Sequence, residues 1–277
     1  MRWSKLTSPA LALALGSSAL LINVPVVQAG GFQLFEPSAV AIGNFGAGAA
    51  AEASDASVNF FNPAGLTRFN TTQAVVFVGL VDTGSKVTGT SSQTVLPFPP
   101  YVESGVAKGG TTNPLGAFHI ARPLAPNVVF GLSVTSPFGL RTEYKGDSFV
   151  RYQATKSELI TLDVSPSLAV KLTERLSVGL GVSAQYAKAN LNSMVGLPQC
   201  FDNPACDSLP APAMNSAYPD FFDSASLNSG FDWGWGINAG VLYEFNEGSR
   251  IGVGYRSKVQ HSLQGDSRLL GILASTN

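Results

Sequence analysis

The sequence predicts an all-β fold, a transmembrane antiparallel β-barrel with an N-terminal plug, from three observations. Only 13% of the 277 residues are charged and 29 are glycines, which is unusual for a soluble domain. Several segments alternate apolar with small or polar residues, as strands with one lipid-facing side do. The connections between these segments alternate between long and short, as the external loops and periplasmic turns of such barrels do.

Residues 1–29 are predicted to be a signal peptide. Arg2 and Lys5 precede an apolar run over 11–22, and Ala29 ends a small-residue cleavage pattern. An uncleaved membrane anchor is the alternative, which the cleavage pattern disfavours. No later apolar run approaches the roughly 20 residues of a membrane helix, so membrane crossing falls to strands.

The predicted strands are recognised by their alternation. In 176–186 the even positions are apolar and the odd positions are serine, glycine or glutamine. The same pattern recurs in 127–136, 160–172, 231–245 and 251–263, and less regularly in 73–82 and 115–122. The sequence therefore predicts about seven strands, with residues 30–70 forming the plug and 71–277 the barrel wall.

A soluble antiparallel sandwich would show the same alternation, with the apolar faces forming a shared core. The lengths of the connections favour the barrel. The gaps near 83–113, 137–157 and 191–230 are long, and each is followed by a short one. A sandwich gives no reason for this regularity, so we expect the N-terminus in the periplasm and the long loop about 191–230 outside.

Catalytic and metal chemistry is not predicted. The chain has two histidines, His119 and His261, each in a predicted strand. Neither stands at metal-ligand spacing from a cysteine or carboxylate, and no nucleophile motif accompanies them. We expect a protein that is not an enzyme, with no metal and no cofactor. A formal net charge of −1 also argues against a nucleic-acid partner.

The long loop about 191–230 combines prolines with an unusual number of apolar side chains. Phe201, Phe221 and Phe222 are predicted to capture an apolar ligand at the surface. Packing of these residues onto the barrel rim is the alternative. Cys200 and Cys206 lie in the same loop, where an oxidising exterior would allow a disulfide.

A candidate polar site lies in the predicted strand 251–263. Arg256 and Lys258 stand on the face opposite its apolar residues, which would be the lumen side. Two cations there could bind a ligand carboxylate. They could equally pair with acidic residues of facing strands, namely Asp163, Asp232 or Glu244.

The stretch Gly30 to Arg68 carries G-F-Q-L, then A-E-A-S-D-A-S, then N-P-A-G. In these motifs it resembles the N-terminal hatch of the FadL/TodX family, outer-membrane transporters of hydrophobic compounds. Similar family segments follow in order at 136–144, 150–159, 176–186, 233–244 and 255–265. The resemblance covers the chain from Gly30 to about Gly265.

The resemblance implies transport of hydrophobic molecules in a Gram-negative outer membrane, most directly of long-chain fatty acids. Ligand would be captured outside, reach a lumen site near Phe32 and leave sideways beside a kinked strand at 127–136, which contains Gly131. Asn62, Pro63 and Ala64 would form a fixed turn at the bottom of the plug. The implied partners are an apolar small molecule, outer-membrane lipid and the barrel-assembly machinery.

Two other functions stay open. A basic lumen residue of fatty-acid-type members is not matched, because Ser193 stands about where it would fall. Aromatic hydrocarbons are therefore an alternative substrate, and a surface barrel fragment without transport is a second alternative. The family has about fourteen strands, so we also expect this chain to be a fragment or a prematurely terminated copy, with an oligomer of half-barrels as the alternative.

Overall fold

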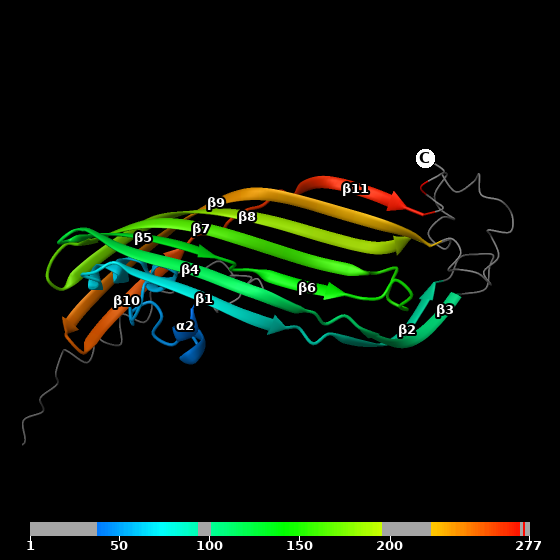
Figure 1. Ribbon diagram of the computed structural model, residues 1–277, viewed down its shortest axis with the longest axis horizontal. Helices are drawn as coiled ribbons and strands as arrows, with labels where there is room; N and C mark the ends of the chain where they lie inside the picture. The colour runs from blue at the N-terminus through cyan, green and yellow to red at the C-terminus, as the bar shows by residue number, and fades with distance from the viewer. Residues whose placement is uncertain (1–37, 94–100, 196–222, 272–273, 275–277) are drawn as a thin grey trace, which may run out of the picture. The chain divides into compact units, whose positions relative to one another are not determined.

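The computed structural model describes residues 38–93, 101–195, 223–271 and 274, all within the compact unit Phe32–Asn277 (Figure 1). In these ranges, no helix has the length and apolar character to cross a membrane. Several predictions lie outside the described residues: the signal peptide 1–29, Phe32, Phe201, Phe221, Phe222, and the pair Cys200 and Cys206.

One antiparallel sheet dominates the fold, and its strands pair in the order in which they occur along the chain (Figure 1). Its path consists of β1 (Gln73–Asp82), β4 (Thr112–Ala125), β5 (Val128–Thr135), β7 (Lys156–Lys171), β8 (Leu176–Val195), β9 (Ser224–Asn246) and β10 (Ser249–Arg256). Beside this path, β6 (Gly139–Glu143) pairs with β7 and β11 (Gln264–Leu270) with β9. The predicted antiparallel wall of about seven strands is confirmed.

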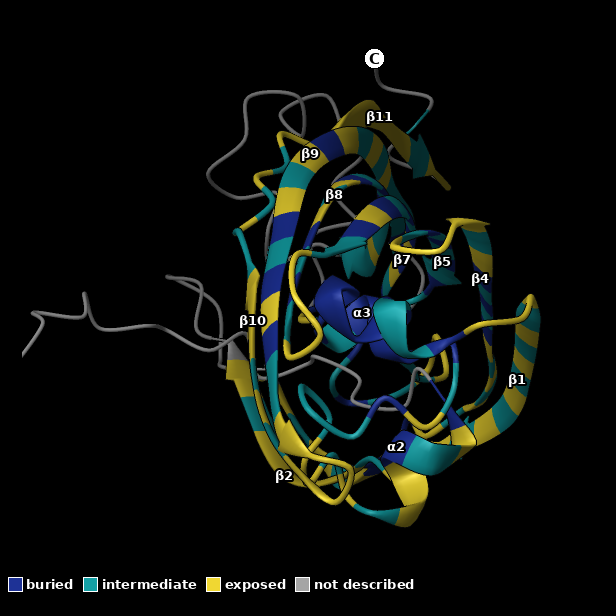
Figure 2. Ribbon diagram, turned by 90° about the vertical axis from the view of Figure 1, so that its left-hand side faces the viewer, coloured by how far each residue is buried: buried dark blue, intermediate teal, exposed yellow. Residues whose placement is uncertain are grey.

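The apolar face of this sheet is exposed and its polar face is buried. In β8, Leu180 is 68% exposed, whereas Ser183 and Gln185 on the other face are buried. Figure 2 shows the resulting alternation along β1 and β9. A soluble sandwich would bury its apolar face, so the sheet has the inside-out pattern of a membrane barrel wall.

Residues 38–69, which we call the docked segment, lie against the polar inner face of the sheet. They contain α2 (Ala39–Gly43), α3 (Val58–Phe61) and the 3₁₀ helix η2 (Pro63–Arg68). Figure 2 shows α3 inside the curve of the sheet. One buried apolar cluster forms the contact, in which Ala121, Val129 and Ala169 of the wall pack with residues of the docked segment that include Val58 and Leu66.

Glycines allow the docked segment to approach the wall closely. Gly179 pairs with Gly240, and Gly240 pairs with Gly254, so the three form one row across β8, β9 and β10. A Cβ atom at Gly179 would lie 2.5 Å from the backbone N of Ala64. Cβ atoms at Gly240 and Gly254 would likewise overlap residues 61–62. Side chains here would push the segment off the sheet.

Two of the predicted long gaps contain strands. The gap 83–113 holds the hairpin of β2 (Lys86–Gln93) and β3 (Tyr101–Lys108), and the gap 137–157 holds β6. The third gap is shorter than predicted, because the β8–β9 ladder continues to the pair Val195 and Ser224. This end of the ladder is rich in serine and asparagine and has few large apolar residues, among them Leu191 and Leu227, so its hydropathy alternation is weak.

The predicted strand 251–263 was wrong in its second half. β10 ends at Arg256, paired with Asn238, and the ladder resumes where Gln264 pairs with Phe231. Between these pairs, 257–263 is one residue longer than the facing part of β9, so the chain leaves the ladder as in a β-bulge. It lies over Gly234, where a Cβ would be 2.8 Å from the His261 ring.

Candidate functional site

The N-P-A motif fixes the docked segment to the wall. Asn62 is fully buried, and its Oδ1 accepts a hydrogen bond from Ala64 N at 3.0 Å. Its Nδ2 donates to the carbonyls of Ala50, at 2.6 Å, and Val241, at 3.0 Å. Pro63 stands at the first turn of η2, where its missing N–H is not needed. All polar atoms of this side chain are thus used within the protein.

Two arginines attach the docked segment to the wall, one at its C-terminal end and one at its middle. Arg68 forms an ion pair with Glu244 on the inner face of β9. Arg250 of β10 donates to the backbone carbonyls of residues 51 and 52, at 2.5 and 2.7 Å. Burial, followed by the nearby charge of Arg250, lowers the pKa of Arg68. The charges of Arg68, Glu244 and Arg250 therefore serve contacts within the protein.

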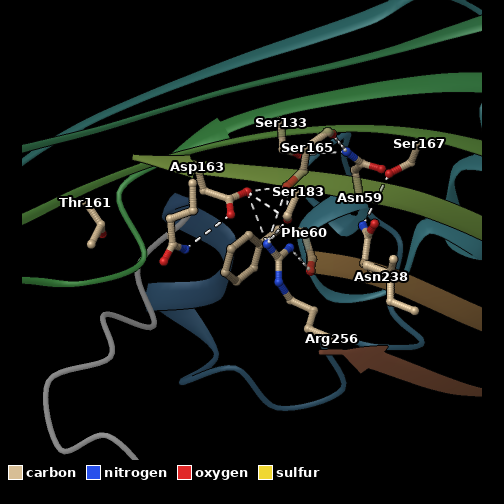
Figure 3. A network of polar contacts seen from close by, with 12 residues as sticks. Asn59, Phe60, Ser133, Thr161, Asp163, Ser165, Ser167, Ser183, Asn238 and Arg256 are labelled. Carbon is tan, nitrogen blue, oxygen red and sulfur yellow. Dashed lines mark hydrogen bonds and ion pairs between the residues drawn. The ribbon is translucent and has the colours of Figure 1, made fainter. Parts of the chain in front are cut away.

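A buried polar network lies at the middle of the inner face (Figure 3). Asp163 of β7 is completely buried and accepts hydrogen bonds from the Ser165 hydroxyl and from Gln185 Nε2, the latter at 3.3 Å. Arg256 Nη2 lies 3.2 Å from Asp163 Oδ1 and 2.9 Å from Ser183 Oγ. The sequence had left this Arg256–Asp163 pair as one alternative, and the structure contains it.

Arg256 also contacts the docked segment. Its guanidinium carbon lies 4.4 Å from the centroid of the Phe60 ring, and Nη1 donates to the Phe60 carbonyl at 3.3 Å. The second predicted cation, Lys258, lies beyond the end of β10 and is exposed. The structure therefore does not bring the two cations together in one site.

Both histidines of the chain belong to this inner face. His119 is fully buried with its Nδ1 2.8 Å from Ser133 Oγ, which also accepts from Asn59 at 2.8 Å. His261 lies 3.0 Å from Gln185 Oε1 through its Nε2. The Ser133–His119 pair is buried, so a substrate does not reach it. Through Ser133 and Asn59 it forms part of the surface on which the docked segment packs. Among the described residues, no cluster of metal-ligating side chains is found.

The wall has a break between β4 and β6. The β4–β5 ladder ends at the pair Phe118 and Val134, and β6 pairs with β7 alone. The intervening residues 136–138 are held by Thr161, whose hydroxyl donates to the Phe138 carbonyl at 2.7 Å and accepts from Phe138 N at 2.9 Å. We call the break, residues 112–117 opposite 136–140, the β4–β6 window.

A cavity of about 210 Å³ lies at the window. Its lining comes from β1, β4, β6 and β7 and includes Leu115, Leu140, Leu159 and Ile160. Leu159 and Ile160 are neighbours in β7, so their side chains point to opposite faces of the sheet. The cavity therefore reaches from the inner face towards the lipid-facing side.

The upper edge of the window is closed by loop contacts. Thr111 Oγ1 donates to the Arg141 carbonyl at 3.1 Å, and Glu143 N donates to the Gly109 carbonyl at 3.0 Å. These bonds reconnect the two sides of the wall beyond the break. The window is thus bounded by hydrogen bonds at both ends.

The predicted kinked strand 127–136 needs correction. β5 keeps a regular ladder with β7 as far as Thr135, and the break follows it. Gly131 does not interrupt the strand, because it makes room for the docked segment: a Cβ there would lie 2.8 Å from Asn59 Oδ1. The signal that could have located the break is Pro137, which has no N–H for a ladder.

An exposed apolar face, a buried polar face and long strands in a sequential antiparallel sheet define this protein as a transmembrane β-barrel protein. The family model described as outer membrane protein transport protein (OMPP1/FadL/TodX) matches residues 21–276. The chain belongs to this family. Its placement in the outer membrane of a Gram-negative bacterium and its assignment as a non-enzyme are thereby confirmed.

Relatives and solved structures agree with this family. The chain is 34% identical over 260 residues to outer membrane protein P1 of Haemophilus influenzae, covering 88% of this chain and 56% of the relative. It is 31% identical over 256 residues to the long-chain fatty acid transport protein of Escherichia coli O6:H1, covering 90% and 56%. The chain thus spans about half the length of these relatives.

Solved structures show the same fold at lower identity. A Pseudomonas aeruginosa FadL homologue matches with a TM-score of 0.63 and 20% identity, covering 80% of this chain and 52% of that chain. The toluene transporter TbuX of Ralstonia pickettii matches with a TM-score of 0.55 and 20% identity, covering 79% and 57%. Both matches cover about half of the solved barrels.

Proposed function

We propose that this protein takes up hydrophobic molecules, most directly long-chain fatty acids, and releases them sideways through the β4–β6 window. The observation that carries the proposal is the cavity of about 210 Å³ at a break in the wall, with lining residues on both faces. Capture is assigned to Phe201, Phe221 and Phe222, and the first lumen contact to Phe32, as the family resemblance implies.

The inner face favours a lateral route over a straight one. The docked segment packs on β5, β7, β8, β9 and β10 through buried hydrogen bonds and ion pairs, and so obstructs the axial path on that side. An apolar solute gains free energy by entering lipid and loses it by entering water. A side exit into the membrane therefore suits this class of substrate.

The window has a suitable size and lining. An apolar cavity of about 150 Å³ can hold benzene, so the window accommodates one aromatic ring or a segment of an alkyl chain. Its lining combines apolar side chains with polar and charged ones; the apolar residues are Val81, Pro114, Leu115, Leu140, Leu159 and Ile160, and the polar ones include Arg141 and Glu158. Aromatic hydrocarbons are the second candidate substrate. The fatty-acid transporter name of one relative and the toluene transporter title of one structural neighbour support these two classes.

Other parts of the proposal concern partners. The exposed apolar side chains of β8 and β9, among them Trp233 and Trp235, are assigned to contact with outer-membrane lipid. Insertion of such a wall is assigned to the barrel-assembly machinery.

A surface protein without transport is the second alternative.

Filling the window tests the proposal. Leu159→Trp enlarges a side chain of the cavity, whereas Leu168→Trp, the control, changes an exposed residue of the same strand. Each protein is expressed in a strain that lacks its own transporter, and uptake of a long-chain fatty acid and of an alkylbenzene is measured. We expect Leu159→Trp to lower uptake at least about fivefold relative to the control. Uptake of neither compound by the unaltered protein would favour the surface alternative.

A further inference from the structure

We propose that Arg256 is the anchor that holds α3 of the docked segment in place, and not the receptor for a ligand headgroup. The residue ends β10, while its partner Asp163 lies on β7, with β8 and β9 between them in the sheet. The side chain therefore crosses the inner face. Figure 3 shows Phe60 beside this contact.

The charge of Arg256 is needed by the wall. Asp163 is completely buried, and Arg256 is the cation within ion-pair distance of it among the described residues. A buried carboxylate that loses its counter-charge is strongly destabilised. Ser183 and Ser165 contact the same guanidinium at 2.9 and 3.4 Å, so it is oriented by several acceptors as well as by charge.

The same guanidinium holds the docked segment in two ways. Its face covers the Phe60 ring, with 4.4 Å between the guanidinium carbon and the ring centroid, and its edge donates to the Phe60 carbonyl. Cation–π contact and hydrogen bonding to a carbonyl near a helix end are both stabilising. One side chain thus links wall strand, buried acid and α3.

The other attachments of the docked segment act at different places. Asn62 reaches β9 through the Val241 carbonyl, and Arg250 binds the carbonyls of residues 51 and 52. Neither attachment compensates a buried charge. Loss of Arg256 should therefore release α3 locally and leave the sheet assembled.

A cysteine at position 57 reports this release. Ser57→Cys replaces a buried hydroxyl beside α3, in a background with Cys200→Ser and Cys206→Ser, and its reaction with a maleimide is timed in isolated outer membranes. We expect Arg256→Gln to speed labelling at least about tenfold. The control Arg175→Gln, an exposed residue in a turn, should leave the rate unchanged. An unchanged rate in Arg256→Gln would overturn the proposal.

A second variant separates anchoring from general misfolding. Asp163→Asn combined with Arg256→Gln removes both charges, so no buried charge is left unpaired. Labelling in the double variant should stay about as fast as in Arg256→Gln, because neither variant has the guanidinium that contacts the Phe60 ring and carbonyl. A return to the labelling rate of the unaltered protein would assign the fast labelling to the unpaired charge of Asp163 and overturn the anchor.

Uptake provides the arm that depends on the proposed function. An anchor serves every substrate, so Arg256→Gln should change uptake of a fatty acid and of an alkylbenzene by the same factor. A loss confined to the fatty acid would assign Arg256 to a headgroup site and overturn the anchor. The labelling rates are read without transport, so they decide the anchor even if the protein transports neither compound.

Discussion

The wall beneath the docked segment and the wall at the β4–β6 window belong to one sheet but are built in opposite ways. Beneath the segment, the β8–β9 ladder is continuous and many of its inner residues are small, among them Ser177, Gly179, Gly181 and Gly240. At the window, the ladder between neighbouring strands stops, and a cavity lined in part by leucines lies at the break. Close packing thus marks the region that holds the segment, and broken pairing marks the region that we propose as the exit.

The difference shows how one sheet can be closely packed in one region and leave a cavity in another. Small inner residues bring the backbone of residues 61–64 into contact with the wall, which excludes a cavity there. Where the ladder stops, backbone N–H and C=O groups lose their hydrogen-bond partners on the neighbouring strand and need others. At the window this is done by the hydroxyls of Thr161 and Thr111. The predictions below test whether the two regions differ in stability as they do in packing.

The largest effect is expected from Asn62→Ala. The change removes a buried side chain that satisfies Ala64 N and the carbonyls of Ala50 and Val241. We expect a loss of about 3 kcal/mol in the free energy of unfolding, measured by urea titration of the protein in detergent. Asn113→Ala, whose hydrogen bonds at the window are local, is the control. Equal losses in both would break the comparison.

Gly179→Ala should come next. Its new Cβ would lie 2.5 Å from backbone atoms of Pro63 and Ala64, so the docked segment must move. We expect destabilisation by about 2 kcal/mol, read from the same titration. Gly116→Ala adds a methyl group at a strand glycine whose nearest neighbour would be 3.8 Å away. If that variant is destabilised as much, strand glycines matter for flexibility and not for close approach.

Thr161→Val tests the edge of the window at nearly constant volume. It removes the hydroxyl that bonds both backbone groups of Phe138. The expected loss of stability is about 1 kcal/mol, but amide hydrogen exchange of residues 136–140 should increase clearly. Thr135→Val, at a buried position in the continuous part of the wall, serves as control. If Thr161→Val does not speed exchange at 136–140, or if Thr135→Val speeds it as much, Thr161 does not fix this edge of the window.

The smallest effect concerns pH. Burial, and then the hydrogen bond that Tyr152 donates to Asp223, raise the pKa of Tyr152, which lies between β6 and β7. Because the folded pKa exceeds the unfolded value of about 10, the stabilisation is complete below pH 10 and is lost as pH rises towards the folded pKa.

Tyr152→Phe should therefore lower the free energy of unfolding slightly at pH 8. The further decrease between pH 8 and pH 11 should be smaller in this variant than in the unaltered protein. Urea midpoints at the two pH values measure this difference. Tyr186→Phe, on the lipid-facing side of β8, is the control. Its free energy of unfolding should fall between pH 8 and pH 11 as much as that of the unaltered protein. A decline in Tyr152→Phe as steep as in the unaltered protein would contradict the prediction.

From the sequence we could predict the strands in which apolar residues alternate with small or polar ones. The strand at 176–186 and the aromatic strand at 231–245 were located because lipid selects apolar side chains at every second position. The outer ends of β8 and β9 carry serine and asparagine on both faces, and β6 is short, so neither has a pattern that a sequence reveals.

The candidate site was predicted less completely, because it depends on contacts between distant residues. Arg256 was recognised as a lumen-facing cation, but its contact with Phe60 joins positions 196 residues apart. The window could not be predicted from alternation either. It arises near Pro137, beyond which β6 still pairs with β7, as β5 does, but no longer with β4.

The glycine row at positions 179, 240 and 254 has a consequence for how this protein can change over time. Its members are far apart in the chain but touch the same short stretch of backbone. A side chain gained at one member displaces that stretch and thereby alters the surroundings of the other two. Among descendants of this gene, substitutions at the three glycines should therefore occur together, and together with changes in residues 61–64.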